Sequence, residues 1–304
     1  MNPANGTSSV TKFILLGFPS LSQLGRDLTC ALLSFIYAGT LAGNLSTVWT
    51  VLRDPRLQRL PMYILLGNFA WLEVGYITTT VPRMLFDLMN PDVPISFHAC
   101  FMQFYVFYSM STTECFLLAG MALDRYLAIC HPLRYPVLMS PQSSWLLVAS
   151  CWLAGFLWFI GPVALISQLS FCGPNTLDYF VCDPGPLLAA SCAPAPWTEQ
   201  TYSTMNYLII FTTFLFILTS YGLVIRAVLR LPAGAGRHKA FSTCTSHLAI
   251  VGLFYGSLLG DSVTSGKVVT LFYMVGTPFL NPLIYSLRNK EMKEALRRTL
   301  LGGR

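Results

Sequence analysis

Two adjacent charged residues, Asp124 and Arg125, end a long apolar stretch within the segment MALDRYLAICHPLRY at 121–135. Charged side chains are costly in lipid and therefore rare inside membrane-spanning helices. A carboxylate beside a guanidinium forms a charge-assisted hydrogen bond, and breaking it frees five N–H donors for a partner. The pair predicts either an interfacial ion pair at a helix end or a switch that opens toward a partner.

Two further acidic residues, Glu73 and Glu114, lie in the middle of apolar stretches. Each is expected to face the interior of a helix bundle rather than lipid. If the two are neighbours, they would bind a cation or share a proton, because two adjacent buried carboxylates cannot both ionise cheaply. The alternative is a purely structural role in hydrogen bonding.

The composition indicates the elements that must position these residues. The chain has 304 residues, of which 54% are hydrophobic and 11% are charged, whereas soluble proteins carry about 25% charged residues. These values exclude a disordered chain and indicate a polytopic membrane protein. The net charge of +6 is spread over short polar segments. No basic groove or stripe is visible, so we expect no nucleic-acid partner.

A membrane-spanning helix needs about 20 mostly apolar residues, and seven stretches meet this requirement. They are Cys30–Val51, Pro61–Pro82, Ala99–Leu123, Trp145–Gln168, Thr201–Ile225, Phe241–Gly260 and Val268–Leu287. We therefore predict an all-α membrane protein, a seven-transmembrane helix bundle that forms a single domain over 1–304. A transporter is disfavoured because we see no internal repeat.

The distribution of Lys and Arg predicts the orientation of the chain. Of the 19 basic residues, four lie on one side of the predicted spans, at Lys12, Arg26, Arg83 and Lys267, which leaves 15 on the other side. The N-terminal segment 1–25 is then extracellular and the tail 288–304 cytosolic. The tail carries apolar residues at helical spacing among basic ones, which predicts an amphipathic helix on the inner leaflet rather than a disordered tail. Asn5 begins an N-glycosylation sequence on the outside.

Four of the nine cysteines lie at the outer ends of the spans, at Cys100, Cys172, Cys182 and Cys192. Disulfides form on an oxidising outer face, but four cysteines allow three connectivities, and the residues alone leave the choice open. A zinc site is disfavoured because the spacing is wide and no outer histidine completes it. Three of these cysteines fall in the long segment 169–197, which suggests a stapled lid over the bundle.

Several motifs occur in order along the chain. They are Gly43-Asn44, PMYILLGN at 61–68, MALDRYLAICHPLRY at 121–135, Ser220-Tyr221, KAFSTCTSHL at 239–248 and PFLNPLIYSLRN at 278–289. Together they resemble the rhodopsin-like G-protein-coupled receptors, and specifically the odorant receptors. The resemblance covers nearly the whole chain. It implies a receptor in the plasma membrane that binds a small volatile odorant and raises cyclic AMP through the stimulatory olfactory G protein.

The resemblance also implies roles for individual residues. It implies the disulfides Cys100–Cys182 and Cys172–Cys192, and a sodium site near Glu73, where related receptors usually carry an aspartate. The side chain of Glu73 is longer than that aspartate, so a sodium ion at Glu73 and Glu114 remains an open expectation. No other cofactor is expected. The residues implied to form the switch that engages the G protein are Asp124, Arg125, Tyr126, Tyr221, Asn281, Pro282 and Tyr285.

Helical spacing groups further residues on single faces of the spans, and the resemblance places them around the ligand cavity. The predicted ligand-binding residues are Phe104, Phe107, Tyr108, Ser111, Thr112, Met205, Asn206, Ile209, Tyr255, Leu258, Leu259, Ser262, Leu271 and Met274, with Tyr202 on the same face as Met205. Such stripes also arise from ordinary helix packing. Phe107 stands where amine receptors carry an aspartate, so we expect a neutral, mostly apolar ligand with one oxygen function.

Two alternatives to an odorant receptor remain at this stage. One is a non-olfactory rhodopsin-like receptor for another small molecule, which KAFSTCTSHL at 239–248 argues against. The other is a transporter, which the missing internal repeat disfavours. A membrane enzyme would need a nucleophile with its base or a metal motif, and the chain contains no GxSxG or HExxH motif. We therefore expect no enzymatic activity.

Overall fold

The computed structural model describes residues 10–172, 175–230, 244–245, 247–256, 267–285 and 289–300. The long helices are α1 (Gln23–Arg53), α2 (Pro61–Met89), α3 (Phe97–Cys130), α5 (Pro141–Trp158), α6 (Ile160–Ser167) and α8 (Pro196–Leu229). They are followed by the helix His247–Gly256, α10 (Lys267–Leu271), the π-helical segment η2 (Phe272–Gly276), α11 (Thr277–Tyr285) and α12 (Lys290–Leu300). The short elements are β1 (Lys12–Leu15), η1 (Leu57–Arg59), β2 (Ile95–Ser96), α4 (Tyr135–Leu138), β3 (Thr176–Leu177) and α7 (Pro184–Ala189).

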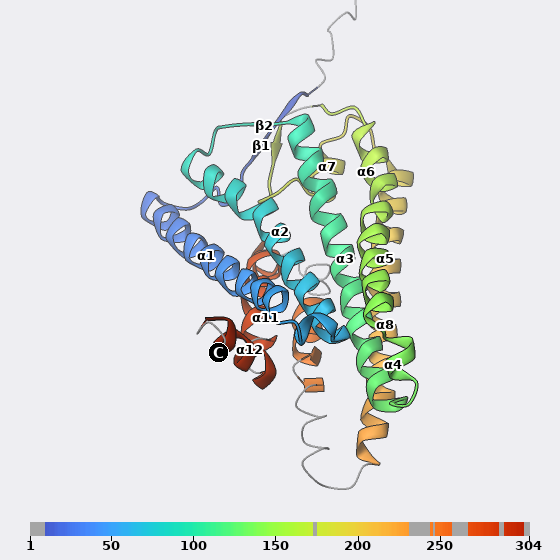
Figure 1. Cartoon of the computed structure of the whole chain (residues 1–304). Coiled ribbons are helices and arrows are strands. Elements are labelled where there is room, and N and C mark those ends of the chain that lie inside the picture. The colour runs from blue at the N-terminus through green and yellow to red at the C-terminus, as the bar shows by residue number, and fades with distance from the viewer. Residues whose placement is uncertain are drawn as a thin grey trace, which may run out of the picture.

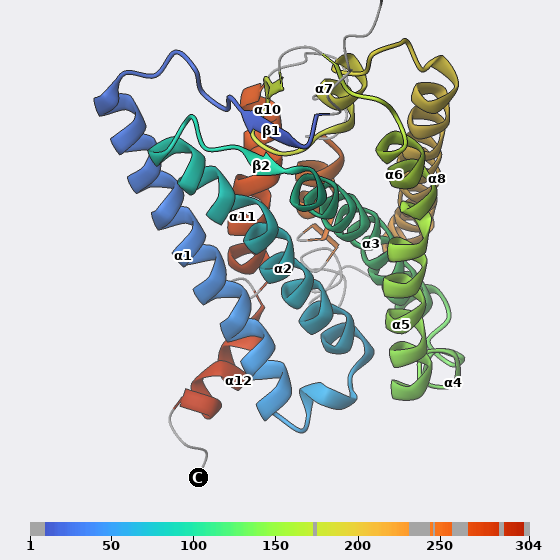
Figure 2. The ribbon, with the colours of Figure 1, turned by 90° about the horizontal axis from the view of Figure 1, so that it is seen from above.

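The long helices form a bundle in which α3 packs against α2, α5 and α8, while α1 packs against α2 and α11. One end of the bundle carries the strands and α7, and we call it the disulfide end (Figure 1). The other carries α4 and α12, and we call it the Arg125 end. Figure 2 shows α1, α2 and α3 side by side, with α5, α6 and α8 beyond them.

Four of the described helices are long and apolar enough to cross a membrane, namely α1, α3, α8 and the pair α5–α6. The prediction of a helical membrane protein is therefore confirmed. The sixth predicted span lies partly outside the described residues, as does the end of the seventh.

Two predicted spans are less regular than expected. The fourth, Trp145–Gln168, consists of α5 and α6, which meet at Phe159. Pro162 lacks the N–H that would bond to the carbonyl of Trp158 in a continuous helix, so the helix breaks there. The seventh contains the π-helical segment η2, and such segments are frequent at functional sites.

A three-stranded sheet in the order β2-β1-β3 covers part of the disulfide end. Lys12 pairs with Ser96 in the antiparallel β1–β2 ladder, and Ile14 pairs with Thr176 in the parallel β1–β3 ladder. Phe13 on β1 is fully buried in an aromatic cluster beneath the sheet. This sheet could not be predicted from the sequence, because its strands are too short to show an alternating pattern.

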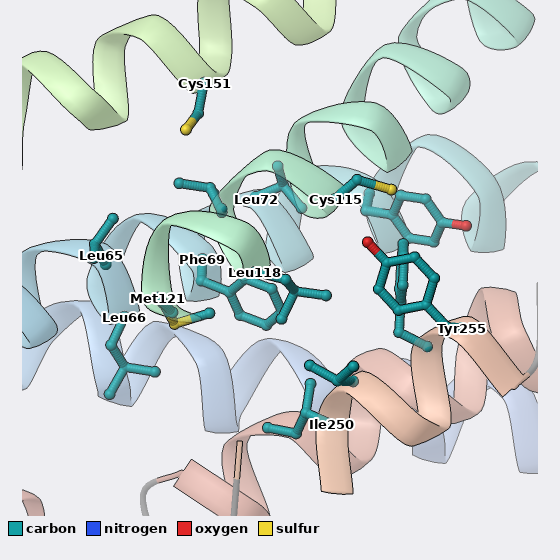
Figure 3. Close-up of a cluster of buried hydrophobic side chains, with 14 of the residues drawn as sticks. Leu65, Leu66, Phe69, Leu72, Cys115, Leu118, Met121, Cys151, Ile250 and Tyr255 are labelled. Atoms are coloured by element: carbon teal, nitrogen blue, oxygen red, sulfur yellow. The ribbon is translucent and has the colours of Figure 1, made fainter. Parts of the chain in front are cut away.

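The centre of the bundle is a cluster of apolar side chains from α2 and α3 that meets the helix His247–Gly256 (Figure 3). Its labelled members include Leu65, Leu66, Phe69, Leu72, Leu118, Met121 and Ile250. Gly155 lets α5 approach α3 closely. A Cβ at Gly155 would lie 2.0 Å from Thr113 Oγ1 and 3.0 Å from the carbonyl oxygen of Ser109, both on α3. The packing of α5 on α3 therefore requires glycine at this position.

The amphipathic helix predicted in the tail is α12, so the disordered-tail alternative is wrong for these residues. Met292 and Ala295 on its apolar face are buried against the bundle. Arg298 Nη2 donates to Asp54 Oδ2 at 2.7 Å, just beyond the end of α1. Burial raises the pKa of Asp54, but hydrogen bonds from Arg298 and from the backbone N–H of Arg56 outweigh burial, so the pKa lies below its usual value.

The close packing at Gly155 predicts a specific intolerance. Gly155→Ala should lower stability by about 1–3 kcal/mol, because the new methyl group overpacks against α3. Gly222→Ala in α8 is the matched control, since a Cβ added there would meet no other side chain or neighbouring helix within 4 Å, and it should be neutral or stabilise by roughly 0.5–1 kcal/mol. Thermal unfolding of both purified variants would check this, and equal midpoints would contradict the packing described.

The contact between α12 and Asp54 predicts a pH dependence. A carboxyl group whose pKa is lowered on folding stabilises the folded state above its unfolded pKa of about 3.9, and this stabilisation disappears as the pH falls through the folded pKa. Wild-type protein should therefore have a higher thermal midpoint than Asp54→Asn at pH 7. The difference should close as the pH is lowered below about 4. A difference that stays constant over this range would show that the ion pair does not stabilise the docking of α12.

Candidate ligand-binding site

A cavity of about 230 Å³ lies within the bundle toward the disulfide end. Its walls come from α3, from α8, from α10 and η2, and from the segment that leads from β3 into α7. The residues that line it are Phe107, Tyr108, Ser111, Thr112, Cys115, Tyr179, Val181, Asp183, Pro184, Gly185, Tyr202, Ser203, Asn206, Tyr207, Ile209, Ile210, Thr270, Tyr273 and Met274. Aromatic and aliphatic side chains mixed with hydroxyl groups are typical of small-molecule sites.

Hydrogen bonds between different walls of the cavity hold its shape. The Tyr108 hydroxyl on α3 donates to Asp183 Oδ1 at 2.6 Å. Ser111 on α3 shares a hydrogen bond of 2.6 Å with the hydroxyl of Tyr273 on η2. The hydroxyl oxygen of Tyr179, in the segment from β3 into α7, lies 2.7 Å from Thr270 Oγ1 on α10. These three contacts join α3, the loop and the α10–η2 segment around one space.

The segment that leads from β3 into α7 forms the loop wall of the cavity. Two disulfides and several polar contacts hold it in place. The disulfides Cys100–Cys182 and Cys172–Cys192 both form in the structure, with the connectivity that the family resemblance implied. The backbone N–H of Cys182 donates to Gln103 Oε1 at 3.1 Å. Lys267 Nζ at the start of α10 lies 2.5 Å from Asp178 Oδ1. The loop is thus a rigid wall of the cavity.

Seven of the predicted ligand-binding residues line the cavity, namely Phe107, Tyr108, Ser111, Thr112, Asn206, Ile209 and Met274, as does Tyr202. Helical spacing predicted the α3 wall well because these residues recur on one face at steps of three and four. Leu258, Leu259 and Ser262 lie outside the described residues, so the prediction for them stays open.

Four predicted residues do not line the cavity. Phe104 is buried one turn of α3 nearer the disulfide end, in the aromatic cluster beneath the sheet. Tyr255 donates its hydroxyl to Thr213 Oγ1 at 2.7 Å, within the core. Leu271 packs against the main core. Met205 is half-buried, and its carbonyl oxygen accepts a hydrogen bond from Trp158.

The loop wall and part of the seventh span line the cavity without having been predicted to do so. Tyr179, Val181 and Asp183 reach the cavity because the disulfide and the β1–β3 pairing fold the loop inward. No periodicity could have indicated them. Tyr273 was missed because the prediction took Leu271 and Met274 as the inward positions of the seventh span, whereas Thr270, Tyr273 and Met274 line the cavity.

Glu73 and Glu114 are both buried inside the bundle, as expected for acidic residues in spans. Asn281 Nδ2 on α11 donates to Glu73 Oε1, and the two carboxyl groups are close enough to interact electrostatically. Among the described residues, Glu73 Oε2 and Glu114 Oε1 have no hydrogen-bond partner. Unpaired buried oxygens of this kind fit a bound cation or a shared proton, since oxygen ligands suit hard cations.

Asp124 and Arg125 form a closed ion pair at the Arg125 end. Arg125 Nη2 and Nε lie 2.5 and 2.9 Å from Asp124 Oδ2. The hydroxyl of Tyr135 on α4 donates to Asp124 Oδ1 at 2.7 Å. Burial and the neighbouring Asp124 charge raise the pKa of Tyr135, so this donor stays protonated. α3 continues to Cys130, so the pair lies in its last two turns rather than at its end.

Other predicted switch residues surround this ion pair or lie along α11. The hydroxyl of Tyr221 hydrogen-bonds to His247 Nδ1, and the hydroxyl oxygen of Tyr126 lies 3.0 Å from His131 Nε2. Asn281 is buried and donates a hydrogen bond to Glu73. The side chain of Tyr285 lies outside the described part of the chain.

The Gly43-Asn44 motif has a clear structural basis. A Cβ at Gly43 would lie 2.9 Å from the Cβ of Pro282, so glycine lets α1 approach α11 at that proline. Asn44 Nδ2 donates to the carbonyl of Pro278 at 3.2 Å. Pro282 has no N–H to donate to the carbonyl of Pro278 in the helix. Asn44 of α1 donates to that carbonyl instead.

A bundle of apolar helices with a cavity at one end and a closed ion pair at the other defines a helical membrane protein with a candidate ligand site. Comparison with known proteins supports a finer assignment. A family model described as olfactory receptor matches residues 33–302. Olfactory receptor 11H6 of Homo sapiens is 54% identical over 99% of this chain and 93% of its own length. Human olfactory receptors 11G2 and 11H4 are 52% and 50% identical, over 98% and 100% of this chain and 88% and 96% of their own lengths. The chain therefore belongs to the olfactory receptor family, whose members are receptors rather than enzymes.

The hydrogen bonds of Gln103 lead to a prediction about the loop wall. Its side chain is buried and bridges the N–H of Cys182 and the carbonyl of Thr79. Gln103→Leu should lower stability by about 1–3 kcal/mol, because the buried backbone N–H of Cys182 loses its acceptor. Gln168→Leu is the control, since Gln168 is exposed at the same end of the bundle. Thermal unfolding would check this, and equal stability of the two variants would show that Gln103 does not support the loop.

Proposed function

We propose that this chain is an odorant receptor with seven membrane-spanning helices that binds a small, mostly apolar volatile ligand in the cavity and activates the stimulatory olfactory G protein. Ligand binding then raises cyclic AMP. The observation that carries the proposal is the cavity of about 230 Å³ built by α3, α8, η2 and the loop. A cavity of about 150 Å³ holds benzene, so this volume suits a volatile molecule of slightly greater size.

The resting state of the receptor is the one with Arg125 held by Asp124. Activation requires the guanidinium to leave this carboxylate and bind the G protein, because Arg carries the donors that a partner's acceptors need. Tyr135 strengthens the resting state through its contact with Asp124. Tyr221 and Tyr285, with Asn281 and Pro282, are proposed to rearrange when the Arg125 end opens.

The buried carboxylates are proposed to act as a cation or proton site between the cavity and the Arg125 end. A sodium ion would take oxygens of Glu73 and Glu114, and Asn281 already orients Glu73. No group of three or more His, Cys, Asp or Glu side chains that could hold a metal occurs within the described residues. The donors at Glu73 and Glu114 are carboxylate oxygens, which suit a hard cation better than a soft transition metal.

The remaining proposals concern placement in the plasma membrane. The N-terminus is proposed to be extracellular, with glycan at Asn5, and the C-terminus cytosolic, with α12 on the inner leaflet. The disulfides at one end agree with an oxidising outer side. Seven spans and this orientation would make residues 1–304 a single receptor domain.

A cyclic AMP reporter assay tests the proposed function. Cells that express this chain with trafficking helpers would be screened against volatile alcohols, aldehydes, esters, ketones, acids and amines. We expect a dose-dependent rise that Arg125→Ala abolishes, because the alanine variant cannot present the guanidinium to the G protein.

Arg53→Ala is the matched control, since Arg53 is exposed at the end of α1 and lies outside the switch. Surface amounts of all three proteins would be compared by flow cytometry. A response that survives Arg125→Ala at equal surface expression would refute the proposed switch. Silence of the well-expressed wild type across the panel would refute the proposed signalling.

A further inference from the structure

Helix α12 is fixed against the bundle by contacts on two of its sides. Met292 is buried among the apolar side chains of the core. On one flank, Arg298 Nη2 donates to Asp54 Oδ2 at 2.7 Å, and Glu291 Oε2 accepts from the hydroxyl of Tyr63 at 2.9 Å. Glu291 and Arg298 are about two helical turns apart and therefore lie on the same flank. These contacts determine which side chains of α12 point away from the bundle.

The other flank of α12 combines cationic and apolar side chains that recur at steps of three and four, and so share one side of the helix. We call this set the cationic flank, and its members are Lys293, Leu296, Arg297 and Leu300. Lys293 and Arg297 are exposed, and Leu300 is 72% exposed. A helix that carries Lys or Arg beside Leu in this way binds at the boundary between lipid headgroups and acyl chains.

Most acidic side chains at this end of the bundle are engaged away from the cationic flank. The described acidic residues at the Arg125 end are Asp54, Asp124, Glu291 and Glu294. The first three contact Arg298, Arg125 and the Tyr63 hydroxyl, respectively, and Glu294 is exposed one turn before Arg298. Helix α12 carries more basic than acidic residues, and the segments beside it in the sequence, 286–288 and 301–304, include no Asp or Glu. The cationic flank therefore lies in a positively charged environment.

Two residues at the end of α1 indicate the level at which lipid headgroups lie. The guanidinium carbon of Arg53 is 4.2 Å from the centroid of the Trp49 ring, and both side chains are exposed. Tryptophan gathers at membrane–water interfaces, and Arg near a helix end extends toward the headgroups. Helix α12 packs against α1 (Figure 2). The cationic flank is therefore close to the headgroup level that Trp49 and Arg53 mark.

From this arrangement we propose that the cationic flank of α12 is a binding site for the headgroups of anionic phospholipids. Arg297 holds phosphate oxygens with its planar set of donors and Lys293 with its compact charge, while the acyl chains lie against Leu296 and Leu300. A headgroup with several phosphates engages both cations at once. This inference rests on the proposed function, since it takes the Arg125 end as the cytosolic one, and it adds a preferred lipid chemistry to the proposed placement of α12.

Native mass spectrometry of the full-length chain in an uncharged detergent tests the proposal by counting the lipid molecules bound per chain. The probes are phosphatidylcholine, phosphatidylserine and phosphatidylinositol 4,5-bisphosphate, with soluble inositol 1,4,5-trisphosphate as the headgroup alone. We expect the bisphosphate lipid to bind at the lowest concentration, followed by phosphatidylserine and then phosphatidylcholine, because attraction grows with headgroup charge. The soluble headgroup should bind more weakly than its lipid, since it lacks the acyl chains that contact Leu296 and Leu300.

The double variant Lys293→Gln/Arg297→Gln removes the two cations. Both side chains are exposed and glutamine is a good helix former, so α12 should stay docked, with an unchanged thermal midpoint in the absence of lipid. Binding of the bisphosphate lipid should weaken about tenfold or more, because each cation near an anionic lipid surface contributes several-fold to binding. The charge-conserving variant Lys293→Arg/Arg297→Lys should bind this lipid nearly as well as wild type.

Lys12→Gln/Arg26→Gln is the matched control, because it removes the same charge from the disulfide end of the bundle. It should leave lipid binding unchanged. Equal weakening by the two double variants would assign the effect to overall charge and overturn the proposal. So would binding of phosphatidylcholine as tight as that of the anionic lipids, or a soluble headgroup that binds as tightly as its lipid.

The lipid assay and the cyclic AMP assay fail in different ways. Binding of anionic lipid at the cationic flank without any cyclic AMP response would refute the proposed signalling but leave the lipid site standing. An odorant response that depends on Arg125, with no preference for anionic lipid, would refute the lipid site but leave the receptor function standing.

Discussion

The structure depends on the burial of α3 in the middle of the bundle. This helix has neighbours on several sides, with α2, α5 and α8 all packed along it. Of its most apolar stretch, 61% is buried, compared with 17% for α1 at the edge of the bundle. A polar group in such a place must find a partner within the protein. Thr112 and Thr113 do so by donating to carbonyls of their own helix, one turn earlier.

The same helix links the two functional ends. Its residues from Phe107 to Cys115 form one wall of the cavity, Glu114 faces the buried polar site next to it, and Asp124 holds Arg125 two to three turns further on. The other side of this path is the seventh span. There Tyr273 contacts Ser111 and Asn281 contacts Glu73. A ligand that moves Tyr273 would therefore act on α3 and on the seventh span, two of the three elements that carry the switch residues.

Much of this arrangement could be predicted from residue types and spacing, and the errors have physical reasons. Helical periodicity predicts which face of α3 turns inward, but it does not say where along that face the cavity ends and the core begins. Phe104 and Tyr255 lie outside the cavity for this reason, and their role in ligand binding stays a prediction. Asp183 could not be found by periodicity, because its position follows from a disulfide and a strand pairing between distant segments. The break at Phe159 was foreseeable from Pro162, whereas the π-helical turn of η2 left no signal in the sequence.

The most direct test of the account is whether an activating ligand occupies this cavity. Cys115 is a free thiol that lines it, whereas the free thiols of Cys30 and Cys130 lie elsewhere and are half-buried. Methyl methanethiosulfonate would be applied to the purified receptor with and without a saturating agonist, and modification of each cysteine would be followed by mass spectrometry. The account predicts that the agonist slows modification of Cys115 and leaves Cys30 and Cys130 unchanged. Equal modification of Cys115 with and without the agonist would place the ligand elsewhere and contradict the account.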